Sequence, residues 1–546
     1  ILILGAGRVG SSLAEMLVVD KSDVTVVDTD IDALEKLQER FDLRTVAGTA
    51  TSLDVLEEAG IDEADLLVAV TANDEVNLVA CKLGYKKFNV PQRIARVRST
   101  QWLKYPDLLN TEGFAVDKLI SPESSVTGTI KSLIQIPEAL QVIEFADGRV
   151  TMLAVIAHPG GLLVSHPISD IKDHLPSVDC RIVSVYRKGK ALLPEAATHI
   201  EIGDEVFVLV ATENVSQVLR ELRQIDDPVR RVMIVGGGNV GTRVAMAVSE
   251  NMTPKLIDHN KARCERISQT LGGKALVIYG DATDEALLIE ENVANVDMFV
   301  ALTNDDENNI MSALLAKRLG ARRVMALINR KAYAELVEGG NIDITVTPSH
   351  ATLGELLKYI RRGDIEAVHS LRRGAAEALE IIVHGDKKNS KVVGRKIEEI
   401  RSPPGTTLPA LVRDGEVHIA HRHTVIQSDD HVIVFVVDKA NTSAVEQLFT
   451  VGFTFFFAIF PLTSRADVAS LRVCRVSRRP GRFRAVLRSF ERQTILLQMR
   501  SDVFTRQPFD IHYFHNRLRH RRLNPELLHR RDELRVQLRR PHQPLS

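Results

Sequence analysis

Three glycines near the start of the chain form a motif that binds phosphate in many proteins. Gly5, Gly7 and Gly10 give the pattern G-x-G-x-x-G between a short Ile/Leu run and a segment of helical periodicity. Glycine permits a tight turn, close approach of a pyrophosphate and close packing of strand on helix. The first turn of the helix offers free amide donors to the phosphates. The spacing therefore predicts a phosphate-binding loop.

An acidic residue follows this loop at the distance that ribose recognition requires. Asp28 stands 18 residues after Gly10, at the end of the next strand pattern. A carboxylate there accepts hydrogen bonds from both ribose hydroxyls and repels a 2′-phosphate, which selects adenosine or NAD over NADP. The same set recurs, with Asp258 standing 17 residues after the last glycine of a second G-x-G-x-x-G motif. We therefore predict two nucleotide sites, with a plain turn as the alternative for the second.

Further candidates lie where the carboxyl ends of parallel strands form the ligand crevice of such a fold. Arg96 and Arg98 share one face of the strand pattern "RIARVR", from which they reach phosphate or form a solvated edge. The candidate nucleotide-binding residues are Gly5, Ala6, Gly7, Arg8, Val9, Gly10, Asp28, Thr49, Thr71, Ala72 and Arg96 in the first copy, and Gly236, Gly238, Asn239, Val240, Gly241, Asp258, Asp281, Thr303 and Asn304 in the second.

The same glycines occur in NAD-dependent oxidoreductases, which is the alternative function. Such an enzyme needs an acid or base beside the nicotinamide. The Tyr-x-x-x-Lys spacing is found at Tyr186 and Lys190, but these flank a hairpin turn rather than one helical face. The chain has no HExxH, nucleophile-elbow or Walker-lysine motif. We predict no catalytic residue and a binding protein rather than an enzyme.

The elements that position these motifs form one unit that occurs twice in the chain. Gly5, Asp28 and Thr71 recur 230 to 232 residues later, and the intervening Val/Ile/Leu runs alternate with helical patterns, as in βαβ units. A second segment with strand-like alternation recurs at a constant offset of 226 residues. We predict an α/β fold in which two nucleotide-binding domains, residues 1–125 and 230–350, alternate with two small α+β domains, residues 140–223 and 365–449.

Composition and charge separate this body from its C-terminal tail. The chain has 546 residues, of which 45% are hydrophobic and 26% charged, with 70 basic and 71 acidic groups. No apolar run reaches the roughly 18 to 20 residues of a membrane-spanning helix. The four cysteines are widely spaced, as expected of a reducing compartment. Residues 450–546 are rich in arginine, which suggests either a basic arm for nucleic acid or, as we favour, a frame-shifted, non-native tail.

The duplicated arrangement, both glycine motifs with their acids, and the segments "TNDDENNIMSALLAKRLGARRVM", "HSLRRGAAEALE" and "VVGRKIEEI" closely resemble the TrkA family. Members carry tandem RCK modules, each an RCK-N and an RCK-C domain. The resemblance covers about residues 1–449. It implies a cytoplasmic regulatory subunit, peripheral on the inner face of the cell membrane, that binds NAD(H) and the regulatory ligands ATP and ADP. The implied partners are a TrkH-type potassium transporter and further copies of the chain, without nucleic acid.

The resemblance also assigns roles to single residues. Arg8 stands where related proteins place an arginine that reaches phosphate across a dimer interface, and its counterpart in the second copy is Asn239. Glu123 follows a proline after the last strand, where some relatives hold a divalent cation, so it is a candidate metal ligand. The second copy has Pro348 and Ser349 there and lacks the carboxylate.

Overall fold

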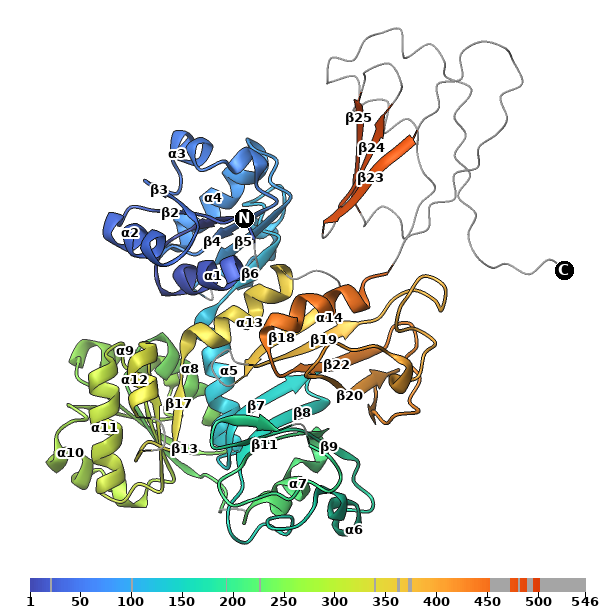
Figure 1. Cartoon of the computed structure of the whole chain (residues 1–546). Helices are drawn as coiled ribbons and strands as arrows, with labels where there is room; N and C mark the ends of the chain where they lie inside the picture. Colours follow the sequence, from blue (N-terminus) through green and yellow to red (C-terminus); the bar gives the residue numbers. More distant parts are fainter. Residues whose placement is uncertain are drawn as a thin grey trace, which may run out of the picture. The chain divides into compact units, whose positions relative to one another are not determined.

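The chain is described by a computed structural model (Figure 1). It divides into two compact units, Ile1–Phe456 and Phe457–Ser546, which are treated separately. The described residues are 1–19, 22–99, 102–192, 194–224, 227–337, 340–360, 364–371 and 376–451 of the first unit, and the strands 472–479, 482–488 and 494–500 of the second.

The first domain is a six-stranded parallel sheet of order β3-β2-β1-β4-β5-β6, the order of dinucleotide-binding folds. Its strands are β1 (Leu2–Leu4), β2 (Thr25–Asp28), β3 (Arg44–Ala47), β4 (Leu66–Ala69), β5 (Gln92–Arg96) and β6 (Lys118–Ile120). Its helices are α1 (Arg8–Val19), α2 (Ile31–Arg40), α3 (Leu53–Glu58), α4 (Asp74–Lys86) and α5 (Pro122–Gln135). The central strands β1, β2 and β4 are Val/Ile/Leu-rich and largely buried, as a sheet covered on both faces requires, whereas the edge strand β3 is mostly exposed.

The third domain repeats this architecture with the strand order β14-β13-β12-β15-β16-β17. Its strands are β12 (Arg231–Val235), β13 (Thr253–Asp258), β14 (Leu276–Tyr279), β15 (Met298–Ala301), β16 (Arg323–Leu327) and β17 (Ile344–Val346). Its helices are α8 (Asn239–Val248), α9 (Lys261–Leu271), α10 (Glu285–Glu290), α11 (Asp306–Arg318), α12 (Lys331–Leu336) and α13 (Pro348–Ile360).

The helix starts of the two copies share their capping chemistry. The side chain of Asp30 caps α2 by accepting a hydrogen bond from the Ala33 amide, and Asn260 caps α9 through the Arg263 amide. Asn73 caps α4, and Asp305 caps α11 in the same way. Short polar residues at these positions satisfy amides that the first helical turn leaves free. The duplicated sequence therefore encodes duplicated helix boundaries.

The second and fourth domains are small antiparallel sheets with the same strand order, β7-β8-β11-β9-β10 and β18-β19-β22-β20-β21. The second domain consists of β7 (Ala139–Phe145), β8 (Val150–Ile156), α6 (Ile171–His174), β9 (Cys180–Arg187), β10 (Lys190–Leu192), β11 (Glu205–Ala211) and α7 (Val215–Leu222). The fourth consists of β18 (Ile365–Leu371), β19 (Ala376–Ile382), β20 (Thr406–Arg413), β21 (Glu416–Ile419), β22 (His431–Val436) and α14 (Thr442–Phe449). The predicted alternation of two α/β and two α+β domains is confirmed.

The two α/β domains exchange helices. In α5, Val126, Ile130 and Leu133 are buried in one cluster with Val232 and Val244 of the third domain. Reciprocally, Leu353 and Leu356 of α13 are buried in the core around β1 and α1 of the first domain. Figure 1 shows α5 beside α8, and α13 beside α1. Each of these two cores is therefore completed by a helix that follows the other domain's last strand, which ties the two domains together.

The two small sheets share a third core. Phe145 and Phe207 of the second domain pack with Phe435 and Leu371 of the fourth. The Phe207 and Phe435 rings lie 5.9 Å apart, centroid to centroid. This apolar burial adds a second contact between the halves of the duplicated chain.

The second unit contributes three antiparallel strands, β23 (Arg472–Arg479), β24 (Arg482–Arg488) and β25 (Thr494–Arg500). The rest of the tail at residues 450–546, for which we predict a non-native origin, lies outside the described residues apart from Thr450 and Val451. In the part of the chain that the structure describes, no helix combines the length and apolarity that crossing a bilayer requires.

Candidate nucleotide-binding site

The first glycine loop has the geometry that its spacing predicts. Gly5 adopts a φ of +113°, which favours glycine, directly after β1. A Cβ on Gly10 would lie 1.8 Å from the carbonyl oxygen of Gly5, so this residue must be glycine for α1 to pack on the strand. A Cβ on Gly7 would meet no atom within 4 Å. The loop therefore leaves open space at the start of α1, where a pyrophosphate fits.

The second loop repeats these features. Gly236 has a φ of +99°, and a Cβ on Gly241 would lie 1.9 Å from the Gly236 carbonyl oxygen. Gly238, at the start of α8, again has open space where a Cβ would stand. Both loops thus provide a cradle at a helix N-terminus.

The carboxylate of Asp28 retains capacity to accept further hydrogen bonds. Its Oδ2 accepts a hydrogen bond from the Ala6 amide, and its Oδ1 accepts one from the Asp30 amide at 2.9 Å and a long one from the Thr29 hydroxyl. A carboxylate has about four acceptor positions, and this side chain is partly exposed. Asp28 therefore remains available to ribose hydroxyls.

The carboxylate of Asp258 is engaged differently. It accepts hydrogen bonds from the amides of Gly237 at 2.7 Å and Asn260 at 2.8 Å, and it forms an ion pair with Arg263 Nη1 at 3.0 Å. Burial alone would raise the pKa of this carboxyl, but the two amides and the guanidinium lower it below its ordinary value. Only 1% of the side chain is exposed, so Asp258 is an ionised, internally paired group.

One cavity of about 1430 Å³ is lined by residues of both α/β domains. It contains most of the candidates from the first copy, namely Gly5, Ala6, Gly7, Arg8, Val9, Asp28, Thr49, Thr71, Ala72 and Arg96. From the second copy it contains Gly236, Gly238, Asn239, Val240, Asp258, Thr303 and Asn304. Gly10, Gly241 and Asp281 do not line it. The structure therefore brings the two predicted sites together in one cavity.

Asp281 has a local structural role. Its Oδ1 accepts hydrogen bonds from the amide and the hydroxyl of Thr283 at 2.9 and 2.8 Å, and these bonds lower the pKa of the carboxyl. Its counterpart Thr49 does line the cavity. The corresponding strand ends of the two copies therefore differ in their relation to the cavity.

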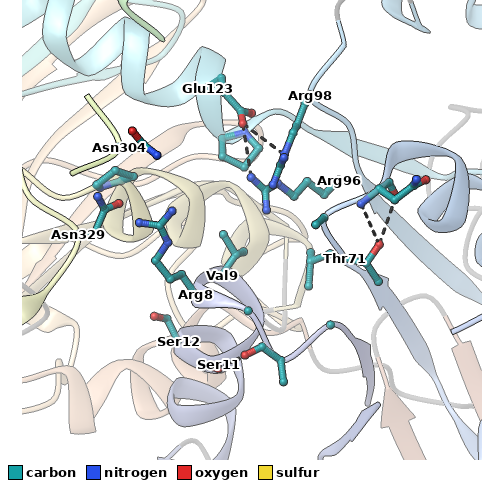
Figure 2. Close-up of a pocket in the computed structure, with 18 of the residues that line it drawn as sticks. Arg8, Val9, Ser11, Ser12, Thr71, Arg96, Arg98, Glu123, Asn304 and Asn329 are labelled. Atoms are coloured by element: carbon teal, nitrogen blue, oxygen red, sulfur yellow. Dashed lines mark hydrogen bonds and ion pairs between the residues drawn. The ribbon is translucent and has the colours of Figure 1, made fainter. Parts of the chain in front are cut away.

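Three arginines and one glutamate concentrate charge in this cavity. Figure 2 shows Arg96 and Arg98 converging on Glu123, whose Oε1 lies 3.4 Å from Arg96 Nη2 and 3.7 Å from Arg98 Nε. Arg8 extends toward Asn304 of the third domain (Figure 2). The Glu123 carboxylate is thus paired with cations, and the described residues contain no group of three acidic, His or Cys side chains that would hold a metal. The predicted divalent cation gains no support.

The second copy lacks these arginines. In α4, the side-chain amide of Asn77 donates a hydrogen bond to the Arg96 carbonyl at the end of β5. In α11, the side-chain amide of Asn309 donates to the Leu327 carbonyl at the end of β16, so Arg96 and Leu327 are equivalent residues of the two copies. Arg8, Arg96, Arg98 and Glu123 therefore correspond to Asn239, Leu327, Asn329 and Ser349. At these four positions the cationic groups come from the first copy, while the second copy has no charged side chain there.

A buried asparagine that sequence reasoning missed positions the strand ends. Asn77, which is fully buried, accepts hydrogen bonds from the Thr71 amide and hydroxyl and donates to the carbonyls of Thr71 and Arg96. Asn309 makes the same four contacts in the second copy. The signal was present, because both asparagines end the repeated segments "TANDEVN" and "TNDDENN". Neither asparagine lines the cavity; each positions a strand end through its hydrogen bonds to Thr71 or Thr303.

We expect Asn77→Ala to lower the free energy of unfolding of the first domain by about 2 to 4 kcal/mol, because each buried group left without a partner costs about 1 to 3 kcal/mol. Hydrogen-exchange mass spectrometry over β4 and β5 in a urea series measures this domain separately. Asn309→Ala should produce the same loss over β15 and β16 only. A change below about 0.5 kcal/mol, the range of ordinary surface substitutions, would contradict the positioning role.

Fold and site together define a class of protein: a tandem dinucleotide-fold chain whose paired domains share one nucleotide cavity. Family models agree with this description. The TrkA-N domain model matches residues 1–122 and 232–348, and the TrkA-C domain model matches residues 152–223 and 386–450.

Curated relatives extend the similarity over nearly their whole length. The chain is 50% identical to the Trk system potassium uptake protein TrkA of Halomonas elongata over 456 residues, which cover 84% of this chain and 100% of the relative. It is 50% identical to the protein of that name from Vibrio alginolyticus, covering 82% and 98%. A homolog from Archaeoglobus fulgidus is 34% identical, covering 80% and 96%. The chain belongs to the TrkA family.

Solved structures confirm the fold class. The crystal structure of the GsuK RCK domain matches with a TM-score of 0.52 at 18% identity, covering 82% of this chain and 94% of that one. A GsuK channel bound to NAD matches with a TM-score of 0.52 at 17% identity, covering 82% and 78%. At this identity the likeness concerns the RCK fold alone. The names of the curated relatives denote a transport-system protein and no enzyme.

Proposed function

We propose that the chain is a cytoplasmic regulatory subunit of a Trk-type potassium uptake system, peripheral on the inner face of the membrane. In this proposal it binds NAD(H), ATP and ADP, assembles with further copies of itself, and gates a TrkH-type transporter. The observation that carries the proposal is the single cavity lined by the glycine loops of both α/β domains. Family membership and the printed name of its relatives support the transport role.

The cavity gives nucleotide binding a mechanical consequence. A phosphate held at the Gly5–Gly10 loop lies in the same cavity as Asn304 and Asn329 of the other domain, toward which Arg8 extends (Figure 2). A ligand that contacts both domains binds with a free energy that depends on their arrangement. Binding therefore favours one arrangement over another, and a membrane partner attached to the subunit experiences that shift. No bond in the nucleotide needs to break.

The residues present fit a nucleotide. Open space at Gly7 and Gly238 accommodates the phosphates, and Arg96 and Arg98 supply cations. The unused acceptor position of Asp28, together with the one held only by the long Thr29 contact, accommodates a ribose. The Tyr-x-x-x-Lys spacing of Tyr186 and Lys190 lies on β9 and β10 of a small domain, and neither residue lines the cavity. This placement disfavours the oxidoreductase alternative.

Calorimetric titration of the full chain with NADH, ADP and ATP tests this function at the level of binding. We expect saturable binding of each nucleotide, together with constant NADH absorbance when small carbonyl compounds are added. Failure to bind any of the three nucleotides would contradict the proposal, and steady NADH oxidation would favour the oxidoreductase. Light scattering of the same samples tests the expected homo-oligomer.

A further inference from the structure

The two ribose acids of the duplicated chain differ in what they can still bind. All acceptor positions of Asp258 are used, since Oδ2 accepts from the Gly237 amide and Arg263 Nη1, and Oδ1 accepts from the Asn260 amide and, at 3.4 Å, again from Arg263 Nη1. Within the described residues Asp28 has no arginine partner. One of its acceptor positions is unused, and a second is held only by the long 3.5 Å contact from the Thr29 hydroxyl, which a ribose hydroxyl can replace. The second acid therefore cannot recognise a ribose as the first does.

A guanidinium with free donors lies beside the second acid instead. Arg263 lines the cavity with 38% of its side chain exposed, and within the described part of the chain only its Nη1 is hydrogen-bonded. His259 directly follows the acid, is exposed and also lines the cavity. The corresponding residues of the first copy are Ala33 and Thr29, which carry no charge. Free guanidinium donors beside the neutralised Asp258 carboxylate attract an anionic group, whereas the Asp28 carboxylate of the first copy repels it.

We call the part of the cavity around Gly7 and Asp28 the first crevice and the part around Gly238 and Asp258 the second crevice. We infer that the second crevice binds adenine dinucleotides that carry a 2′-phosphate, while the first crevice selects dinucleotides without it. The 2′-phosphate oxygens accept hydrogen bonds from the free nitrogens of Arg263, and His259 provides a further donor beside them. The ion pair with Arg263 cancels the repulsion that the Asp258 carboxylate would exert on a phosphate. In dinucleotide-binding folds an arginine near the ribose site accommodates the 2′-phosphate of NADP. The inference rests on the proposed nucleotide-binding function and adds a distinct ligand class to the second site.

The test isolates each crevice within the full chain. Gly7→Val and Gly238→Val each add a side chain at one glycine loop, where an added Cβ meets no atom within 4 Å, and we expect each to block the phosphate cradle at that loop. NAD⁺ and NADP⁺ are then titrated into both variants by calorimetry. We expect the Gly7→Val chain to bind NADP⁺ about tenfold or more tightly than NAD⁺, and the Gly238→Val chain to show the opposite preference.

Arg263→Ala in the Gly7→Val chain should lower NADP⁺ affinity by about tenfold or more and change NAD⁺ affinity by less than about twofold. Lys261→Ala is the matched control, since Lys261 loses the same charge from the same helix but does not line the cavity. Arg263→Lys, which keeps the charge and loses the planar fork, should give an intermediate NADP⁺ affinity. Because Arg263→Lys keeps a cation beside Asp258, it distinguishes a loss of phosphate recognition from a folding defect caused by an unpaired Asp258.

The outcomes separate this inference from the function on which it rests. If the Gly7→Val chain binds NAD⁺ at least as tightly as NADP⁺, or if Lys261→Ala weakens NADP⁺ binding as much as Arg263→Ala, the inference is wrong and nucleotide binding stands. If the unmodified chain binds neither dinucleotide, nor ADP or ATP, the proposed function itself fails.

Discussion

Replacement of Gly10 by alanine is expected to destabilise the first domain by about 3 kcal/mol or more, because overpacking a site that cannot relax typically costs about 1 to 3 kcal/mol and occasionally more. The added Cβ would lie 1.8 Å from the carbonyl oxygen of Gly5. That oxygen belongs to the backbone, which ends β1 and is held by hydrogen bonds to neighbouring strands. The clash between the added Cβ and this oxygen is therefore relieved only if α1 moves away from the sheet.

Gly7→Ala is the matched control for this prediction. It makes the same change three residues earlier, at a position where the Cβ meets nothing within 4 Å. Thermal unfolding followed by circular dichroism, with hydrogen exchange over α1, measures both variants. We expect Gly7→Ala to unfold like the unmodified chain and Gly10→Ala to unfold at a clearly lower temperature. Equal stability of the two variants would show that the loop is not packed as described.

The Asp28→Ala variant should bind NADH at the first crevice about 100-fold more weakly or worse, because a hydrogen bond to a charged acceptor contributes about 1.5 to 3 kcal/mol and 1.4 kcal/mol corresponds to a factor of ten. Two such bonds to a ribose are lost together. The measurement is a calorimetric titration of the Gly238→Val chain, in which only the first crevice is open.

Asp32→Ala provides the control for charge in this experiment. Asp32 is exposed on α2, four residues beyond Asp28, and does not line the cavity. Its loss changes the net charge identically and should leave NADH affinity within about twofold, since exposed charges are strongly screened. An unchanged affinity in the Asp28→Ala variant would remove this carboxylate from the ribose site.

The local parts of the site were predictable from the sequence. The turn at Gly5, the packing at Gly10 and the placement of Asp28 depend on residues close in the chain, whose chemistry leaves few alternatives. The repeat then supported the prediction of two α/β domains with βαβ units. Asn77 and Asn309 also carried a signal, since a polar residue repeated at the same offset within a helix indicates a shared buried role.

The contacts between the domains were not predictable in this way. The apolar faces of α5 and α13 fit either of two nearly identical sheets, so periodicity alone does not reveal that each helix completes the other domain's core. The merging of two crevices into one cavity follows from that exchange. Likewise, the sequence places Arg263 five residues after Asp258, but only the backbone geometry shows that the two side chains pair.

A further contact links the second glycine helix to the first crevice. Arg243, one turn into α8, donates hydrogen bonds at 2.8 Å to the Arg98 carbonyl and to the Ser124 hydroxyl. Arg98 and the neighbouring Glu123 line the cavity. We therefore expect any movement of α8 on nucleotide binding to displace the segments that carry Arg98 and Glu123. Such coupling acts in both directions between linked sites.

We propose that this chain controls potassium flux through a membrane partner by binding nucleotide. The most direct test reconstitutes a TrkH-type transporter in vesicles, with and without the full chain, and measures potassium flux while NADH, ADP or ATP is added. We expect the subunit to change the flux and nucleotides to modify that change, with the Gly7→Val, Gly238→Val double variant insensitive to all three. Flux that is the same with and without the subunit under every nucleotide would contradict the account.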